Sequence, residues 1–209
     1  MNLKDFFKEV VEVLKKKKVR FALAGGLVAS LYRHEERSTK DLDFLILTEK
    51  ETQKNAMDII ESFDLTPHIV RQAELEGGPL FAIKRQKTPP YMIIGRKKDD
   101  TTSIGLDFIL PAVPWFEEAL NRAEKNLCDF GFGQIPCLTV EDLIVSKLYA
   151  LKNDTSRFKD LDDLKSIFLA QSTGLEIDLI YISSALKKIN LKIPKLLRKH
   201  LPKALSVIR

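Results

Sequence analysis

Two aspartates, Asp41 and Asp43, open an apolar run that is typical of a buried strand, residues 44–47 (FLIL). Burying a carboxylate costs free energy unless another group pairs with it. Because side chains alternate between the two faces of a strand, Asp41 and Asp43 point the same way and Leu42 points away. Two carboxylates at this spacing repel each other, so one takes up a proton or a cation lies between them. Oxygen ligands on a rigid strand suit Mg²⁺, and we interpret the pair as a metal site.

A third aspartate, Asp107, also interrupts an apolar strand, residues 103–110 (SIGLDFIL). If this strand lies beside residues 41–43, three carboxylates converge. Three carboxylates can hold two metal ions roughly 3.5–4 Å apart, the arrangement that serves in-line phosphoryl displacement. The alternatives are a structural pair at Asp41 and Asp43 that meets arginines or caps a turn, and an Asp107 that faces solvent.

A glycine pair, Gly25-Gly26, ends a predicted strand and starts a helix. Glycine lets the backbone approach a ligand closely, and a helix N-terminus offers free N–H groups to phosphate. The pair alone is a weak indication, because many turns contain one. Neither a GxxxxGK nor a GxGxxG motif occurs, so P-loop and dinucleotide-binding sites lose their support.

Residues 25–26, 37–43 and 107 together resemble the nucleotidyltransferase superfamily, of which DNA polymerase beta is a member. They match its GG turn, its D-x-D strand and its third carboxylate. The run RSTKDLD has the R-x-T-x-D-x-D form of the branch that includes the AbiEii-type abortive-infection toxins. The resemblance implies an α+β fold, in which a nucleotidyltransferase-type mixed sheet is flanked by helices and followed by a C-terminal helical region.

The second half of the chain carries two further motifs of that branch. Residues 138–150 (LTVEDLIVSKLYA) resemble its helix with an inward lysine, and residues 157–164 (RFKDLDDL) resemble its R-x-x-D-x-x-D helix. The resemblance implies that Lys147 contacts the nucleotide phosphates; the alternative is a lysine that only extends along an apolar stripe. Arg157 and Asp160 suit a structural salt-bridge network, in which Asp160 holds Lys147 in place.

The resemblance also implies the roles of the site residues. Asp41, Asp43 and Asp107 are the expected catalytic residues and bind two Mg²⁺ ions, and Asp107 acts as, or aligns, the base on the acceptor hydroxyl. The expected nucleotide-binding residues are Gly25, Gly26, Arg37, Thr39 and Lys147. Arg37 and Thr39 have an alternative role, which is to order the turn before the strand.

Hydrophobic periodicity and turn signals predict the elements that position these residues. The predicted strands are 19–24, 41–48, 68–73, 80–85, 91–97 and 103–110. In the first part of the chain, the predicted helices are 3–18, one that begins within 27–34, one that a Thr48–Glu51 capping box opens and that runs to 63, and 114–126. In the second part, Thr139 caps one helix, Gly174 stops another at 157–170, and two more follow. The last of these starts at Pro194. We expect a core at residues 1–138 and a helical region at 139–209 packed on it.

The composition is that of a soluble globular protein, with 209 residues, 44% of them hydrophobic and 30% charged. No apolar run approaches the roughly 18 residues of a membrane span, and the N-terminus lacks the apolar core of a signal peptide, which favours the cytoplasm. Spacing allows a disulfide between Cys128 and Cys137, but free thiols fit a reducing compartment better. The net charge of +5 weakly favours anionic partners. The basic residues of the last two dozen positions suit either a solvated helix face or a nucleic-acid surface.

We therefore expect a metal-dependent nucleotidyltransferase that transfers a nucleoside monophosphate from an NTP to an acceptor hydroxyl and releases pyrophosphate. The AbiEii resemblance and the basic C-terminus favour tRNA as acceptor, within a toxin–antitoxin pair. A protein hydroxyl or an aminoglycoside-like small molecule is an alternative acceptor. Two rival functions are an inactive nucleotide-binding or protein-interaction module and a metal-dependent phosphohydrolase.

Overall fold

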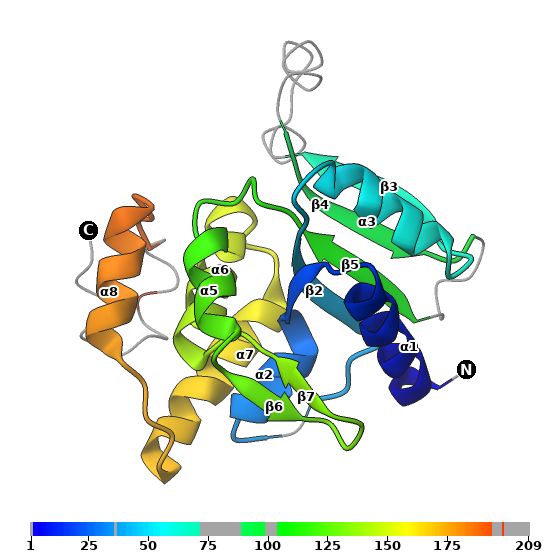
Figure 1. The fold of residues 1–209 in the computed structure, drawn as a ribbon. Helices are drawn as coiled ribbons and strands as arrows, with labels where there is room; N and C mark the ends of the chain where they lie inside the picture. The colour runs from blue at the N-terminus through cyan, green and yellow to red at the C-terminus, as the bar shows by residue number, and fades with distance from the viewer. Residues whose placement is uncertain (1, 36, 72–88, 99–103, 194–197, 199–209) are drawn as a thin grey trace.

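The computed structural model describes residues 2–35, 37–71, 89–98, 104–193 and 198. Within these ranges the centre of the molecule is a five-stranded mixed sheet with the order β1-β2-β5-β4-β3 (Figure 1). Its strands are β1 (Arg20–Leu23), β2 (Asp41–Leu47), β3 (Thr66–Arg71), β4 (Pro90–Arg96) and β5 (Gly105–Ile109). β2 and β5 pair in parallel, and the other neighbours are antiparallel. The mixed α+β fold is therefore confirmed.

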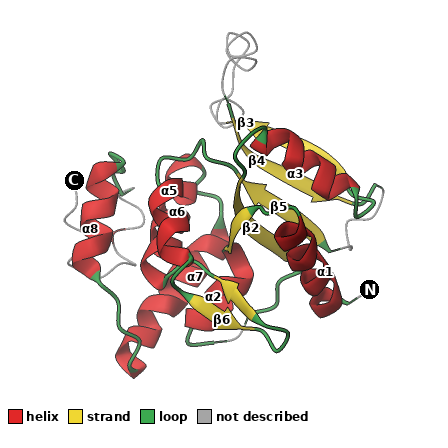
Figure 2. Ribbon diagram, viewed as in Figure 1, coloured by secondary structure: helices red, strands yellow, loops and turns green. Residues whose placement is uncertain are grey.

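Some helices lie over the sheet, and the others form a group beside it (Figure 2). They are α1 (Leu3–Lys16), α2 (Gly25–Tyr32), α3 (Thr52–Glu61), α5 (Phe116–Ala123), α6 (Val140–Asn153), α7 (Phe158–Ala170) and α8 (Leu179–Lys188). α1 and α3 lie on one face (Figure 1). α2 packs on β2 and also contacts α6 and α7, and α6 contacts α8.

The alternation of side chains along β2 decides which face receives the acids. Phe44 is fully buried, and its ring contacts Phe7 of α1 with centroids 5.9 Å apart. Because neighbouring positions point to opposite faces, Asp41 and Asp43 face the other side, toward α2. The chemistry-bearing residues thus face the helical half of the chain, and one hydrophobic core runs through both halves.

The boundary expected at residue 138 is crossed by close contacts. Leu138 N–H donates to Leu23 O at 3.0 Å, and the Tyr32 hydroxyl donates to Leu138 O at 3.1 Å. The first bond joins β1, and the second joins α2, to the segment that enters α6. The division into a core at 1–138 and a helical region at 139–209 stays a prediction.

Two local features differ from the sequence prediction. The Thr48–Glu51 capping box is wrong, because the Thr48 hydroxyl donates to Lys50 O at 2.7 Å and α3 begins at Thr52. Glu51 instead takes a left-handed conformation with φ of 52° just before the helix. The hairpin of β6 (Leu127–Asp129) and β7 (Gln134–Pro136) was not predicted as strands, since three residues are too few to show a period.

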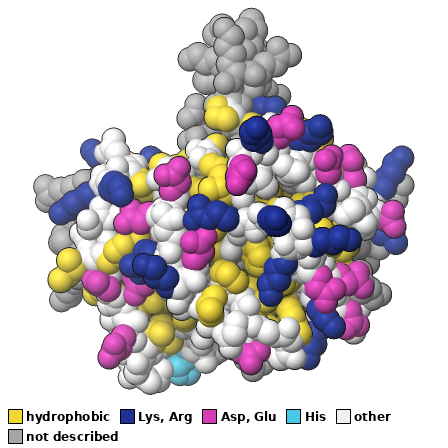
Figure 3. Space-filling model, in the orientation of Figure 1, with side chains coloured by type: hydrophobic (Ala, Val, Ile, Leu, Met, Phe, Trp, Pro, Cys, Tyr) yellow, Lys and Arg dark blue, Asp and Glu magenta, His cyan; other side chains and the backbone are white. Residues whose placement is uncertain are grey.

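Several other expectations have a plain outcome. Thr139 caps α6, as its side chain accepts from Asp142 N–H, and Cys128 and Cys137 are free thiols. The strand predicted at 80–85 lies outside the described residues, and so does the helix predicted from Pro194 apart from residue 198. Among the described helices, none combines the length and apolar character needed to cross a membrane. On the face shown in Figure 3, described acidic and basic side chains are interspersed.

Candidate active site

The two strands that carry the acids, β2 and β5, lie side by side, which was the condition for the three carboxylates to converge. In the parallel pair of β2 and β5, Asp43 is directly opposite Asp107, and Asp41 is opposite Gly105. Residues opposite each other on adjacent strands share a face of the sheet. The three carboxylates therefore converge on the face that looks toward α2. Asp107 is buried, whereas 44% of the Asp41 side chain is exposed, so the group is open on the Asp41 side.

The protonation of these acids shows how crowded the negative charge is. Burial, followed by the charges of Asp107 and Asp41, raises the pKa of Asp43 to about 7. Burial also raises the pKa of Asp107, although its contact with Arg96 acts in the opposite direction. Asp41 and Asp43 offer the oxygen donors that Mg²⁺ prefers, and a cation between them would relieve this repulsion. The donor set thus fits a divalent ion at Asp41 and Asp43.

The glycine pair lets the start of α2 approach the acids closely. Gly25 has a φ of 64°, in the left-handed region that favours glycine, and a Cβ there would lie 1.9 Å from Asp43 Oδ2. A Cβ on Gly26 would lie 3.0 Å from Thr39 Oγ1 and 3.1 Å from Arg37 Nη2. Gly25 is therefore required for space, a side chain at Gly26 would make its neighbours shift slightly, and the pair brings the α2 N-terminus against Asp43, Thr39 and Arg37.

Thr39 orders the entry to β2. Its hydroxyl lies 3.4 Å from the backbone N of Asp41, from which it accepts a hydrogen bond. This contact fits the structural alternative for Thr39, and the residue lies beside Gly26 at the same time.

Lys147 is buried in α6 and faces two acids of α7. Its Nζ donates to Asp160 Oδ1 at 2.9 Å and to Asp163 Oδ2 at 2.6 Å. Burial would raise the pKa of both acids, but the charge of Lys147 and of the neighbouring arginines outweighs it and holds each pKa below its ordinary value. Asp160 thus holds Lys147 in place, and Asp163, which is completely buried, holds it as well.

Arginines complete what we call the α7 charge network. Arg33 and Arg37 both pair with Asp163, Arg33 also pairs with Asp162, and Arg157 pairs with Asp160. The members of the network are Arg33, Arg37, Lys147, Arg157, Asp160, Asp162 and Asp163. Four basic and three acidic side chains leave a surplus of one positive charge.

A cavity of about 300 Å³ joins the two charged groups. Its lining includes Gly25 and Asp43 from the acid side and Lys147, Arg157 and Asp160 from the α7 charge network. Aromatic and apolar side chains form much of the remaining wall, among them Tyr91, Met92, Ile94, Ile109, Val113 and Trp115. A cavity with an acidic group, a basic group and an apolar wall can receive a nucleotide with its cation.

Arg96, at the end of β4, is a site residue that the sequence did not reveal. Its guanidinium donates to both carboxylate oxygens of Asp107, with Nη2 3.0 Å from Oδ2, and Nη2 lies 3.5 Å from Asp41 Oδ1. We call Asp41, Asp43 and Asp107, with Arg96, the carboxylate cluster. Across the ranges that the structure describes, no three acidic, histidine or cysteine side chains form a ready metal-ligand group. A lone arginine at the end of a strand gives no sequence signal for such a contact.

Comparison with known proteins gives one family and several similar folds. The family described as "Nucleotidyl transferase AbiEii toxin, Type IV TA system" matches residues 11–203. The antibiotic-resistance factor ANT(2'')-Ia is 13% identical with a TM-score of 0.50, covering 94% of this chain and 89% of that chain. An antigenic nucleotidyltransferase-like protein from Paracoccidioides brasiliensis is 15% identical with a TM-score of 0.52, covering 91% and 93%. These two similarities show the fold alone. A search of curated proteins gave no match.

Proposed function

The chain belongs to the AbiEii family of nucleotidyl transferase toxins, and from this premise we propose that it transfers a nucleoside monophosphate from an NTP to an acceptor hydroxyl with metal dependence. The observation that carries the proposal is the separation of charge around one cavity. The carboxylate cluster has surplus negative charge, and the α7 charge network has surplus positive charge. A metal–nucleotide complex presents the complementary pair, a cation and a polyphosphate.

Asp41 and Asp43 would hold the metal, which we propose to be Mg²⁺. When bound, the ion would neutralise charge on the triphosphate and on the attacking oxygen. The second ion that the sequence favours would have to share Asp107 with Arg96. The raised pKa of Asp43 supports a metal site. A carboxylate whose ionised form is destabilised by neighbouring negative charges is stabilised when a cation binds beside it.

The triphosphate would lie between the α2 N-terminus and the α7 charge network. Gly25 and Gly26 offer backbone N–H groups to phosphate, and Arg37 and Lys147 offer positive charge. Thr39 would fix the strand entry beside them. This arrangement contributes mainly by positioning and by electrostatic stabilisation, which are the main contributions to phosphoryl transfer.

In the proposed reaction, the acceptor oxygen forms a bond to the α-phosphorus. The bond from that phosphorus to the oxygen that bridges to the β-phosphate breaks, and pyrophosphate leaves with those electrons. Asp107 would take the proton of the acceptor hydroxyl or align the group, since its raised pKa brings it closer to the operating pH.

For the acceptor we propose tRNA, with the chain acting as the cytoplasmic toxin of a pair whose antitoxin is a protein partner. The family description, a toxin of a type IV toxin–antitoxin system, supports the toxin role. We also propose that residues 139–209 form a helical region packed on the core. Most of the basic C-terminal residues lie outside the described ranges, so their part in RNA binding rests on charge alone.

A labelling experiment tests the function. The chain is incubated with Mg²⁺, each α-labelled NTP in turn, and total tRNA, a protein extract or an aminoglycoside. The Asp41→Asn, Asp43→Asn double variant is the test, and Asp58→Asn, an exposed acid of α3, is the matched control. We expect label on tRNA that falls about 1,000-fold in the double variant, since metal coordination contributes several kcal/mol. Label on protein or aminoglycoside would show that this molecule, and not tRNA, is the acceptor. NTP binding with no labelled product would favour an inactive module.

A further inference from the structure

We infer that the Arg96 guanidinium takes the place of a second metal ion, so that the nucleotide-free site binds one divalent ion, at Asp41 and Asp43. The inference deepens the proposed function and rests on it, because it concerns the same carboxylates. It differs from the two-ion arrangement that three acids alone suggest.

The contacts of Arg96 are those of a fixed counter-ion. Nη1 and Nη2 donate to the two oxygens of Asp107, Nη1 also donates to Gly95 O at 2.8 Å, and Nη2 lies 3.5 Å from Asp41 Oδ1. A planar guanidinium that binds both oxygens of one carboxylate gains geometric specificity as well as energy. Arg96 therefore occupies the space between Asp107 and Asp41 that a bridging ion would need.

Gly105 leaves the space through which the Arg96 side chain reaches across β5 toward Asp41. β5 runs between β2 and β4, with Asp41 opposite Gly105 on one side. On the other side Gly95 pairs with Leu106, so the next step of that register places Arg96 opposite Gly105. A Cβ on Gly105 would lie 2.3 Å from Asp41 Oδ1 and 2.4 Å from Arg96 Nη1.

Because glycine has no side chain, position 105 leaves room for the Arg96 guanidinium. Gly105 is not among the described glycines with positive φ, so its backbone conformation does not require glycine. Any other residue would push the guanidinium off β5. The sequence pairs a glycine on β5 with an arginine on β4, and together they place a permanent positive charge among the acids.

The charge of the cluster then matches one divalent ion. Three carboxylates and one guanidinium leave two negative charges when all are ionised. A second ion at Asp107 would have to displace Arg96 from a carboxylate whose side chain is only 9% exposed. The ion would have to replace both hydrogen bonds from the guanidinium to Asp107, and the guanidinium would repel the incoming cation. Arg96 is therefore a positioning residue that holds Asp107 as a hydrogen-bond acceptor, outside the metal's coordination shell.

Counting bound Mn²⁺ tests the inference without any turnover. Electron paramagnetic resonance of free Mn²⁺ is measured on the nucleotide-free full chain, with the Asp41→Asn, Asp43→Asn variant as background. We expect one ion per wild-type chain and two per Arg96→Gln chain, because Asp107 becomes available. Arg96→Lys keeps the charge and should keep one ion, as should Lys97→Gln, which removes the exposed neighbouring cation.

Two further variants protect the test against misfolding, which circular dichroism would report. Arg96→Ala removes the guanidinium through a different side chain and should also give two ions. Arg96→Gln, Asp107→Asn removes both partners and should return the count to one. Two ions on the wild-type chain, or one ion on folded Arg96→Gln or Arg96→Ala, would overturn the inference and leave the proposed function standing. A wild-type chain that binds no more Mn²⁺ than the background variant would overturn both.

Discussion

The carboxylate cluster and the α7 charge network both contribute to the wall of one cavity, yet the pKa values of their acids are shifted in opposite directions. In the cluster, burial and neighbouring acids raise the pKa of Asp43 and Asp107. In the network, lysine and arginine partners outweigh burial and lower the pKa of Asp160 and Asp163. Both regions are built from the same residue types, so the difference lies in how the charges are partnered.

This difference separates a structural role from a binding role. A buried acid with several cations belongs to the folded framework, and removing it leaves unpaired charge. A buried acid among acids costs stability in the free protein and recovers it when a cation binds. The network therefore stabilises the fold and positions Lys147 and Arg37, whereas the cluster is unsatisfied until its ligand arrives.

The largest expected effect is in the network. Asp163→Asn should lower the free energy of unfolding by about 3–5 kcal/mol, because it leaves Arg37 and part of the charge of Arg33 and Lys147 without a partner. Urea denaturation at neutral pH measures this change. The control is Asp162→Asn, since 65% of that side chain is exposed and its pair with Arg33 should contribute about 1 kcal/mol or less. Equal losses in both variants would contradict the structural role of the network.

In the carboxylate cluster, an Asp→Asn substitution should have the opposite effect and raise the free energy of unfolding. Ionised Asp43 destabilises the folded chain because its folded pKa, about 7, lies above the ordinary value of 3.8. The penalty is absent below about pH 4, grows by about 1.4 kcal/mol per pH unit up to pH 7, and is then constant. Asp43→Asn should therefore be more stable than wild type at pH 8 in EDTA and equal to it near pH 4. Urea denaturation at the two pH values checks this, and a variant that is less stable at pH 8 would refute it.

The surplus positive charge of the network should appear as anion binding. Arg157 lines the cavity and its side chain is 50% exposed, so Arg157→Gln should disturb the fold little. We expect about tenfold weaker binding of inorganic tripolyphosphate, a change of about 1.4 kcal/mol, measured by titration calorimetry. Lys159→Gln removes an exposed cation from the first turn of α7, outside the cavity, and is the matched control. Equal weakening by both would mean that only net charge matters.

The sequence predicted the acids of the cluster because a strand's two-residue period needs only local information. Asp41 and Asp43 share a face wherever the strand lies. Their meeting with Asp107 depended on which strands pair, a long-range choice that local pattern does not encode, and here the family resemblance supplied it. Arg96 was missed for the same reason, because its contact depends on the registers of two strand pairs and on the space at Gly105.

Local signals were also incomplete at two other places. The Thr48–Glu51 spacing fits a capping box, yet the Thr48 hydroxyl bonds to Lys50 O and the helix starts four residues later. Lys147 was expected to contact phosphate, and its position beside the cavity agrees, but its Nζ donates to two acids of α7. The sequence suggested Asp160 as one of these partners, whereas the buried Asp163 became evident only when α6 and α7 were seen together.

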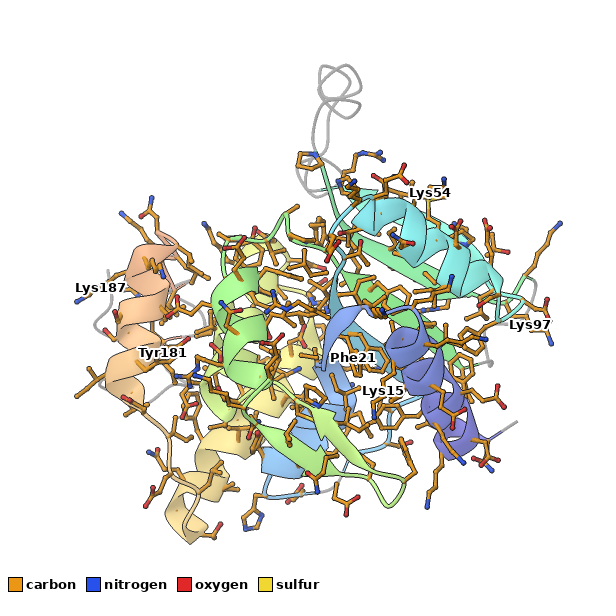
Figure 4. All side chains as sticks on the ribbon, in the orientation of Figure 1. Lys15, Phe21, Lys54, Lys97, Tyr181 and Lys187 are labelled. Carbon is orange, nitrogen blue, oxygen red and sulfur yellow. The ribbon has the colours of Figure 1, made fainter. Side chains whose placement is uncertain are left out.

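The smallest expected effect comes from a third charged cluster, whose described members do not line the cavity. The Tyr181 hydroxyl of α8 donates to Asp142 at 2.6 Å, and Arg122 of α5 lies 3.9 Å above the Tyr181 ring; Figure 4 shows Tyr181 on the side of α8 toward α5. Tyr181→Phe should cost about 1 kcal/mol in urea denaturation, because Asp142 keeps its Arg122 partner. Tripolyphosphate affinity should not change. A changed affinity would show that charged clusters away from the cavity also affect anion binding. It would contradict the assignment of anion binding to the charged groups that line the cavity.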